Sequence, residues 1–337
     1  MVALAGLRTA SAAYVSTVMK KSSATVVPRT EPSVTNAEAR QMIIDAAMAA
    51  GAAAVGIAPA AALDDEAEHE IYNLWLADGR HASLSYMERN EAVRFDPRLL
   101  LPDARTVVCV AFAYGPQPRR SALLADYALG EDYHDVLRRR LAPLAESLRA
   151  LVLDSKTRIV VDTAPMREKW WARRAGLGFV GRNGLLIVPG VGSRVFLAEV
   201  LWTGEASADE PCEMSCDACG ACAQTCPGRA IDGAGSVDAR RCLSYLTIEH
   251  RGELPECVDL PGRIYGCDVC QDVCPHNRGV NPPVVQEFLP SEEILALDIE
   301  RLADMTEDEF KTLFGCSAIR RAGAAGMRRN ALRKLRR

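Results

Sequence analysis

The chain has 337 residues, of which 49% are hydrophobic and 25% are charged, and its formal net charge is −4. This length favours two domains, and the composition is that of an ordinary globular protein. The small negative charge excludes a general polyanion binder, and no apolar run reaches the roughly 18–20 residues that a membrane span needs.

Residues 1–33 are predicted to be a disordered leader. They contain four basic residues but no acid before Glu31, and they are rich in Ser, Thr and Ala. A targeting peptide is the alternative, because transit sequences share this composition. The interrupted apolar pattern argues against a secretory signal.

The fold class is predicted to be α+β or α/β, with residues 34–208 forming a mixed α/β domain that contains a mixed sheet. Thr35 and Glu38 make a capping-box pattern that begins a helix ending near Ala50. Further helices are expected at 66–77, 132–153 and 166–175. Apolar, β-branched runs predict strands at 53–58, 105–114, 157–161, 185–188 and 194–202. Strands that alternate with helices in this way indicate an α/β architecture.

Cysteines dominate residues 209–280. The run from Cys216 to Pro227 reads C-x2-C-x2-C-x3-C-P, the pattern that holds iron–sulfur clusters in bacterial ferredoxins. The run from Cys267 to Pro275 reads C-x2-C-x3-C-P and is one cysteine short, because Ile264 stands where the first would be. Cys242, between the runs, is the natural replacement. We therefore expect a ferredoxin-like domain with two [4Fe-4S] clusters.

The last cysteine of such a run ligates the other cluster. Cluster 1 is therefore predicted at Cys216, Cys219, Cys222 and Cys274, and cluster 2 at Cys226, Cys242, Cys267 and Cys270. Zinc is disfavoured because zinc ribbons use isolated C-x2-C pairs, and a disulfide framework because no secretory h-region precedes the domain. Cys212 and Cys257 are expected to be non-ligands. This cysteine usage indicates a reducing cytoplasm.

Residues 281–337 are predicted to form short helices, at 291–303 and 306–314, followed by a basic tail. From Cys316 to Arg337 there are eight Arg or Lys residues and no acid. Such a tail fits a nucleic-acid-binding surface or, equally well, a solvated helix end.

Asp162 follows a predicted buried strand, at the edge where open α/β sheets bind their ligands. A carboxyl group half-buried there can have a raised pKa and act as a general acid. The alternative is an Asp that caps the next helix.

Residues 176–184 contain four glycines but no G-x-G-x-x-G followed by a helix, so a dinucleotide site is poorly supported. Glycines at this density allow a large flat ligand to approach the backbone.

These motifs together resemble the epoxyqueuosine reductase family. The resemblance rests on both cysteine runs and on the segments 132–134 (Asp-Tyr-His), 162–165 (Asp-Thr-Ala-Pro), 176–187, 242–249, 266–268 and 328–331 (Arg-Arg-Asn-Ala). It covers roughly residues 36–331. It departs from the family pattern at Phe179, Arg182 and His276, where Trp, Lys and Trp are usual. The chain also lacks the helical-repeat extension of longer members.

The resemblance implies a cobalamin-binding α/β domain in which cobalamin is held base-off, without a protein ligand to cobalt. The D-x-H-x-x-G signature of His-on cobalamin proteins is indeed absent. The implied substrate is epoxyqueuosine in a tRNA with a GUN-type anticodon, and the product is queuosine. The implied proton donor is Asp162. The implied cobalamin contacts are Asp162, Asn183, Leu186, Leu243 and Asp268, and the implied tRNA contacts are His250, Arg251, Arg328 and Arg329.

The resemblance further implies that an external low-potential donor of the flavodoxin or ferredoxin kind feeds the clusters, and that a monomer acts in the cytoplasm without a membrane. Cluster 2 is expected to lie nearer the cobalamin. The alternatives are a reductive dehalogenase, which also joins cobalamin to two clusters, and a ferredoxin-type electron carrier. The absence of a twin-arginine signal and the basic tail argue against the dehalogenase.

Overall fold

The computed structural model describes residues 34–336 apart from 64, 217–218 and 234, so the predicted leader lies outside the described residues. Val34–Arg337 form one compact unit. Its helices are α1 (Asn36–Ala49), α2 (Glu66–Ala77), α3 (Glu91–Phe95), α4 (Tyr133–Leu151), α5 (Glu168–Arg174), α6 (Ala221–Thr225), α7 (Leu243–Ile248), α8 (Val269–Asp272), α9 (Glu292–Leu295), α10 (Ile299–Asp304), α11 (Glu307–Phe314) and α12 (Gly323–Leu335). Its strands are β1 (Ala54–Pro59), β2 (Thr106–Ala113), β3 (Thr157–Val160), β4 (Phe179–Val180), β5 (Leu186–Ile187) and β6 (Val195–Trp202).

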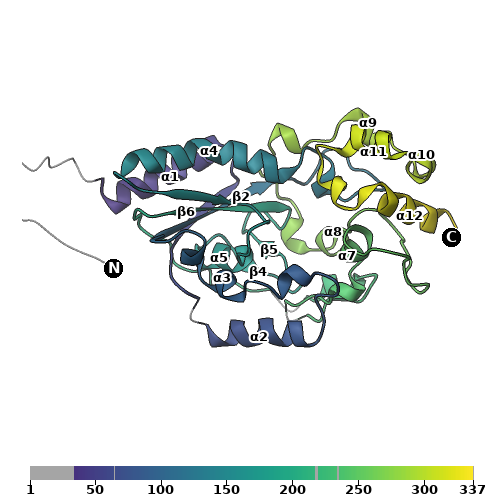
Figure 1. The fold of residues 1–337 in the computed structure, drawn as a ribbon, viewed down its shortest axis with the longest axis horizontal. Helices are drawn as coiled ribbons and strands as arrows, with labels where there is room; N and C mark the ends of the chain where they lie inside the picture. The colour runs from purple at the N-terminus through teal and green to yellow at the C-terminus, as the bar shows by residue number, and fades with distance from the viewer. Residues whose placement is uncertain (1–33, 64, 217–218, 234, 337) are drawn as a thin grey trace, which may run out of the picture. The chain divides into compact units, whose positions relative to one another are not determined.

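A four-stranded sheet in the order β1-β2-β6-β3 forms the middle layer (Figure 1). The expected combination of helices with a sheet is confirmed, and the antiparallel pairing makes it α+β. The expected mixed sheet is wrong, because each of its three strand pairs is antiparallel. Parallel pairing among the described residues is limited to isolated bridges such as Ala113–Val284. A buried strand has the same apolar pattern in either direction, so the sequence pattern could not reveal this.

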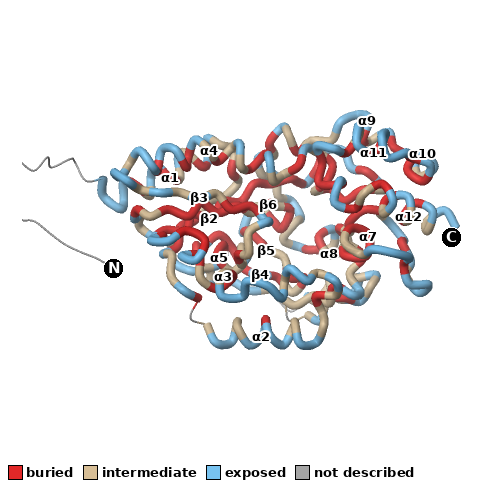
Figure 2. Tube along the Cα trace, viewed as in Figure 1, coloured by how far each residue is buried: buried red, intermediate tan, exposed pale blue. Residues whose placement is uncertain are grey.

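Helices cover both faces of this sheet. On one face α1 and α4 pack on the side chains of alternate β6 residues, Phe196, Ala198, Val200 and Trp202. On the other face α5 packs Trp171 and Ala172 against the opposite set, which includes Leu201. Every residue of β2 is buried, and the middle of the sheet is the most buried part of the fold (Figure 2). Successive side chains of β6 therefore point into two different hydrophobic cores, one on each face of the sheet.

The expected helix starts are confirmed at both ends of the unit. Thr35 and Glu38 form the predicted capping box of α1. Thr306 and Glu309 form a second capping box, at α11. The single helix expected at 291–303 is instead two short helices, because the Asp298 carboxylate accepts the Arg301 N–H and starts α10 anew.

The C-terminal helices and the cysteine segments lie at one end of the sheet (Figure 1). Helices α10, α11 and α12 form a separate core around Phe314 and Met327, which also takes in Ile264 and Tyr265. Ile264, where the second cysteine run lacks a ligand, is fully buried there. The domain boundaries at 208 and 280 stay a prediction. No helix in the described part of the chain is long and apolar enough to cross a membrane.

Candidate active site between the sheet edge and the cysteine segments

A cavity lies where the sheet ends. Antiparallel pairing of β6 with both β2 and β3 brings the carboxyl ends of β2 and β3 to the same edge. Tyr114 and Asp162, just beyond those ends, line a cavity of about 460 Å³ together with Val195 of β6. This volume is within the usual range of small-molecule sites.

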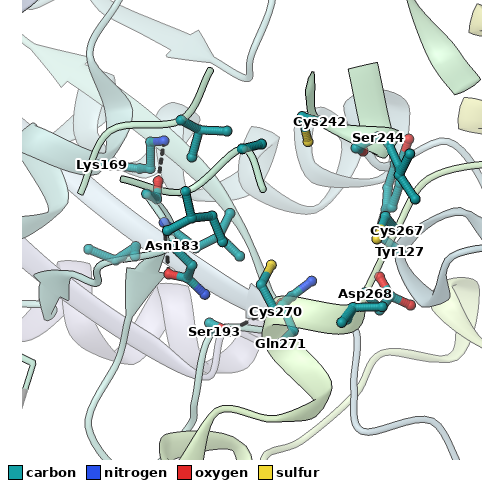
Figure 3. Close-up of a pocket in the computed structure, with 18 of the residues that line it drawn as sticks. Tyr127, Lys169, Asn183, Ser193, Cys242, Ser244, Cys267, Asp268, Cys270 and Gln271 are labelled. Carbon is teal, nitrogen blue, oxygen red and sulfur yellow. Dashed lines mark hydrogen bonds between the residues drawn. The ribbon is translucent and has the colours of Figure 1, made fainter. Parts of the chain in front are cut away.

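Four cysteines line the same cavity: Cys226, Cys242, Cys267 and Cys270. They are the set predicted for cluster 2. Figure 3 shows Cys242 and Cys267 on one side of the cavity, with Cys270 on α8 between them and Asn183. Burial and the neighbouring thiols raise the pKa of Cys267 to about 11 and the pKa of Cys270 to about 12.

The cluster 1 set lines a second, smaller cavity of about 50 Å³. Its lining contains Cys216, Cys219, Cys222 and Cys274. Asn183 lines both cavities, so they are neighbours. The structure therefore divides the eight cysteines into the two groups that the motif predicts. No group of three or more described His, Cys, Asp or Glu side chains is close enough to hold a single metal ion.

The surroundings of the thiols suit iron–sulfur ligation. The Arg182 N–H donates to Cys216 Sγ at 3.4 Å, and the Ala230 N–H donates to Cys226 Sγ at 3.3 Å. Cys242 is the N-cap of α7, and burial raises the pKa of its thiol against the smaller opposing effect of the Tyr245 and Ser244 N–H groups. N–H donors to sulfur are among the features that tune such clusters.

Asp162 occupies a strained turn at the cavity. Its φ is 52°, in the left-handed region, and the Thr163 N–H donates to the Val161 carbonyl at 2.5 Å across it. This is a γ-turn with a positive φ, which is rare for a residue with a side chain. The alternative that Asp162 caps the next helix is wrong, because Arg167 is the N-cap of α5.

The Asp162 carboxylate accepts two hydrogen bonds from α4. The Tyr133 hydroxyl donates to Asp162 Oδ2 at 2.8 Å, and His134 Nε2 lies 3.1 Å from the same oxygen. His134 Nδ1 lies 2.6 Å from Asp132 Oδ1, and Asp132 in turn pairs with Arg320 at 2.9 Å. Burial would lower the pKa of His134, but the hydrogen bonds to Asp132 and Asp162 outweigh it and raise the pKa to about 9.

The pKa of Asp162 shifts in the direction opposite to the one expected. Burial would raise it, but the hydrogen bonds from His134 and Tyr133, with the charge of Arg321, hold the pKa below its usual value. At neutral pH the pair is therefore a carboxylate beside a protonated imidazole, so the available proton is on His134.

Asn183 and Leu186 lie on or beside the β4–β5 hairpin. Asn183 Oδ1 accepts the Leu185 N–H at 3.2 Å, but its buried Nδ2 has no partner among the described residues. Leu186 is buried and contributes to the same lining. An unsatisfied amide beside a cavity indicates a ligand with an acceptor group there.

Asp268 and Leu243 lie in the cysteine wall. The Asp268 side chain is buried, accepts the Asp126 N–H at 2.9 Å and pairs with Arg263 at 3.1 Å. Leu243 begins α7 directly after Cys242. Both residues line the large cavity with Asp162. The structure thus brings all five residues of the implied cofactor site to one cavity.

Comparison with known proteins identifies the family. The model of "Epoxyqueuosine reductase QueG, DUF1730" matches residues 94–163, and that of the "4Fe-4S double cluster binding domain" matches residues 215–277, which supports iron–sulfur clusters. The epoxyqueuosine reductase of Synechocystis sp. is 40% identical over 82% of this chain and 98% of its own length. The chain belongs to the epoxyqueuosine reductase family. Its relative from Gloeobacter violaceus is also 40% identical, over 85% of this chain and 92% of its own length.

Solved epoxyqueuosine reductases have the same fold. One, crystallised with a tRNA-Tyr epoxyqueuosine-modified stem loop, has a TM-score of 0.80 and 32% identity over 88% of this chain and 80% of its own. A Bacillus subtilis structure with its catalytic aspartate loop swung out of the active site has a TM-score of 0.78 and 31% identity over the same shares. The fold and the family expected from the sequence are confirmed.

The four residues predicted to contact tRNA lie outside the cavity lining but near one another. Arg329 on α12 donates to the carbonyls of Leu246, His250 and Gly252. Arg251 donates to the Ile248 and Arg321 carbonyls, and Arg328 to the Ala303 carbonyl. These guanidinium groups already hold carbonyl groups of α7, α10 and their neighbouring segments, so their role toward tRNA in this epoxyqueuosine reductase stays a prediction.

Sequence reasoning missed two acidic residues behind Asp162. Glu168 Oε1 accepts the Asp162 N–H at 2.6 Å, and Glu168 lines the cavity. Glu199 is fully buried in β6, and neither of its carboxyl oxygens has a partner among the described residues. A lone acid within an apolar strand was the available signal for Glu199, whereas nothing in the sequence distinguishes Glu168 from an ordinary first-turn glutamate.

Proposed function

We propose that this chain reduces epoxyqueuosine in tRNA to queuosine. The reaction takes two electrons and two protons: both bonds from carbon to the epoxide oxygen break, an alkene forms, and the oxygen leaves as water. The observation that carries the proposal is one cavity lined both by Asp162 and by four cysteines of a double-cluster domain. Family membership supplies the substrate class.

The eight cysteines of the two runs are proposed to hold two [4Fe-4S] clusters in the sets given above. When bound, the clusters carry single electrons from an external low-potential donor of the flavodoxin or ferredoxin class. The thiols at the large cavity support cluster 2 as the one next to the substrate, and the thiols of the smaller cavity support cluster 1 as the entry point.

The large cavity is proposed to hold cobalamin. The unpaired Asn183 Nδ2 suits an amide carbonyl of the corrin, with Leu186, Leu243 and Asp268 as further wall contacts. No histidine is among the described lining residues, which supports binding without a histidine ligand to cobalt. When bound, cobalamin supplies a strongly reducing cobalt centre for the epoxide carbon.

Asp162 and His134 are proposed to supply a proton to the oxygen as the epoxide opens. The protonated imidazole donates through Nε2 to Asp162 Oδ2, and Asp162 presents the proton to the cavity. Asp132 holds the other ring nitrogen and so fixes the orientation of the ring. A relay of this kind compensates for the low pKa of Asp162.

The substrate is proposed to be a tRNA with a GUN-type anticodon. The exposed surface of α12 and of Arg251, with the basic residues named above, would contact its phosphates. One solved family member was crystallised with an epoxyqueuosine-modified stem loop of tRNA-Tyr, which supports a stem loop as the recognised unit.

The decisive test is a reconstituted assay with epoxyqueuosine-containing tRNA. Protein with both clusters, supplied with cobalamin and a low-potential reductant, is expected to convert epoxyqueuosine to queuosine, as measured by mass spectrometry of the digested nucleosides. The Synechocystis relative serves as the positive control. Conversion by the relative but not by this chain would refute the proposal.

The cluster assignment predicts the iron content of a single variant. Cys242→Ser should lower bound iron from about eight to about four atoms per chain, because cluster 2 loses a ligand while cluster 1 keeps all four. The exposed Cys257 provides the control, and Cys257→Ser should retain both clusters. A Cys242→Ser protein with its full iron content would show that the ligand set is wrong.

A further inference from the structure

Asp132 holds the proposed acid pair in place from the start of α4. Its Oδ1 accepts the His134 N–H at 3.0 Å as the N-cap of α4, and the same oxygen lies 2.6 Å from His134 Nδ1. Because His134 Nε2 lies 3.1 Å from Asp162 Oδ2, a carboxylate is bonded to each nitrogen of the imidazole. A ring held at both nitrogens keeps one orientation, and here that orientation directs Nε2 at Asp162.

The C-terminal part of the chain in turn holds Asp132. Arg320 Nη2 lies 2.9 Å from Asp132 Oδ2, and the Asp132 N–H donates to the Cys316 carbonyl at 2.7 Å. Both contacts come from the segment that joins α11 to α12. The Asp132 side chain is only 3% exposed, whereas Arg320 is half-exposed. A buried carboxylate is stable only where hydrogen bonds and opposite charges satisfy both of its oxygens, and Arg320 satisfies Oδ2.

The backbone that carries Arg320 is itself fixed. Arg320 belongs to a short 3-10 helix, Ala318–Arg321, whose N-cap Ser317 donates through Oγ to the Ala128 carbonyl at 3.1 Å. The Tyr265 hydroxyl donates to the first carbonyl of this 3-10 helix at 2.7 Å. The guanidinium group therefore extends from an anchored segment, so it can orient its partner carboxylate.

We propose that Arg320 is a positioning residue for the proton transfer to the substrate. It holds the Asp132 carboxylate, and Asp132 keeps the His134 imidazole aligned with Asp162. No proton or electron passes through Arg320 itself, because it acts through two intermediate side chains. This inference rests on the proposed function, and it gives the C-terminal helices a part in orienting an acid that belongs to the α/β part of the unit.

A contact with a tRNA phosphate is the competing explanation of Arg320. Half of its side chain is exposed, and it lies in the acid-free stretch from Cys316 to Arg337. An arginine that only bound a phosphate would change the affinity for tRNA and its salt dependence, because each phosphate contact releases counterions. It would leave the acid pair unaltered. The two roles are therefore distinguished by kcat, by KM and by the titration of His134.

Arg320→Gln removes the charge that holds Asp132. In the fully loaded enzyme we expect kcat to fall about 10-fold, the scale of coupling within one hydrogen-bond network, with KM for the modified tRNA unchanged. Arg320→Lys should recover most of this loss, because an ammonium group can still pair with the carboxylate. Arg301 is the matched control, because it is exposed to a similar degree and pairs with Glu293 at 3.3 Å, and Arg301→Gln should behave as wild type. Wild-type iron content and melting temperature verify that each variant is folded.

A double-mutant cycle tests whether Arg320 acts through Asp132. Asp132→Asn alone should slow turnover more than Arg320→Gln, because it weakens the bond to the imidazole directly. Adding Arg320→Gln to Asp132→Asn should then cost less than about 2-fold in kcat, because the carboxylate that Arg320 holds is already absent. Losses that multiply in the double variant would overturn the inference.

The titration of His134 gives a readout that needs no turnover. The titratable and charged groups around the acid pair are Tyr133, Asp132, Asp162, Glu168 and Arg321. Against burial, the hydrogen bonds to Asp132 and Asp162 raise the pKa of His134 to about 9. In Arg320→Gln the Asp132 carboxylate is held less firmly, so the pKa of His134 should fall toward its ordinary value, as followed by NMR of ¹⁵N-labelled histidine. Loss of the Arg320 charge acts in the opposite direction, but that charge is half-exposed and screened by solvent.

The kinetic and NMR results together decide the inference. An Arg320→Gln enzyme with wild-type kcat overturns it, and a raised KM with a weaker salt dependence would then make Arg320 a phosphate contact. A slow variant in which His134 titrates as in the wild type also overturns it, because the loss would not come through the imidazole. If the wild type fails to convert the tRNA while the His134 titration still shifts in Arg320→Gln, the proposed function is refuted and the positioning of the acid pair by Arg320 stands.

Discussion

The chemistry of Asp162 depends on its partners more than on its own acidity. Asp162 alone has a lowered pKa and would be a poor acid at neutral pH. His134, 3.1 Å away, is protonated in that range because two carboxylates raise its pKa. The general acid is therefore the pair of His134 and Asp162, in which His134 holds the proton and the Asp162 carboxylate transfers it.

Asp162→Asn should abolish most turnover while leaving the cofactor sites intact. The amide can still accept a hydrogen bond from Tyr133, so the turn and the cavity are retained, but it cannot relay a proton. We expect kcat to fall about 10²–10⁴-fold, the usual size of a general-acid contribution. Iron content and corrinoid absorbance should match the wild type. Activity near the wild-type value would remove Asp162 from the proton path.

For single residues, the sequence predicted function best where the spacing between residues is itself fixed by the chemistry. The cysteine runs predict two sets of four, and the cavities contain those sets, because ligand spacing in a cluster loop is local. Asp162 could be found because it ends a β-branched run. The hydrogen bonds that lower its pKa come from α4, almost thirty residues earlier, so no local pattern could reveal them.

The β4–β5 hairpin positions one wall of the cavity, and Gly178 allows it to fold closely. A Cβ at Gly178 would lie 2.1 Å from the Ile187 carbonyl oxygen, which is too close for any side chain. The hairpin carries Asn183 in its turn and Leu186 in β5. The glycine is therefore required by close packing of two backbone segments.

Gly178→Ala should weaken cofactor retention as well as stability. The added methyl group has to push β5 away, which displaces Asn183 and Leu186 together. We expect a loss of about 1–3 kcal/mol, as for other overpacked sites, and a lower cobalamin affinity by titration. Gly262→Ala is the matched control, because its Cβ would meet nothing within 4 Å. Equal melting temperatures and equal cobalamin affinities for the two variants would contradict this account.

Element boundaries were predictable, whereas element directions were not. Helices α1, α2 and α4 begin and end close to the expected residues because caps and glycines are local signals. The antiparallel order β1-β2-β6-β3 depends on long connections, and the break between α9 and α10 depends on a single cap at Asp298. The hydrophobic periodicity of the sequence predicts neither the direction of a strand nor a helix break of this kind.

A buried ionic network joins the α/β part of the unit to the cysteine segments. Asp126 is fully buried and pairs with Arg120, Arg194 and Arg263. Asp272 of α8 pairs with the same three arginines. Charged groups from residues 120–126, 194 and 263–272 thus neutralise one another beside the cluster 2 ligands.

Arg194→Met should destabilise the whole unit. Arg194 is 7% exposed, and removing it leaves the buried Asp126 and the half-buried Asp272 with one positive partner fewer. We expect a loss of about 3–5 kcal/mol in the free energy of unfolding, measured by denaturant titration. Arg105, which pairs with Glu205 at an exposed site, is the control, and Arg105→Met should cost about 0–1 kcal/mol. Similar losses in the two variants would show that the network is not stabilising.

The cysteine wall of the large cavity dictates an order of maturation. Its thiols come from three separate segments. Cys226 directly follows α6, Cys242 directly precedes α7, and Cys267 and Cys270 lie just before and within α8. On the proposed ligand sets, cluster 2 would cross-link these segments in addition to their protein contacts, so the wall of the corrinoid pocket would be fully fixed only after cluster 2 has been built. Iron supply would then control how much active enzyme a cell can make, and iron-starved cells would leave their tRNA at the epoxide stage even when cobalamin is plentiful.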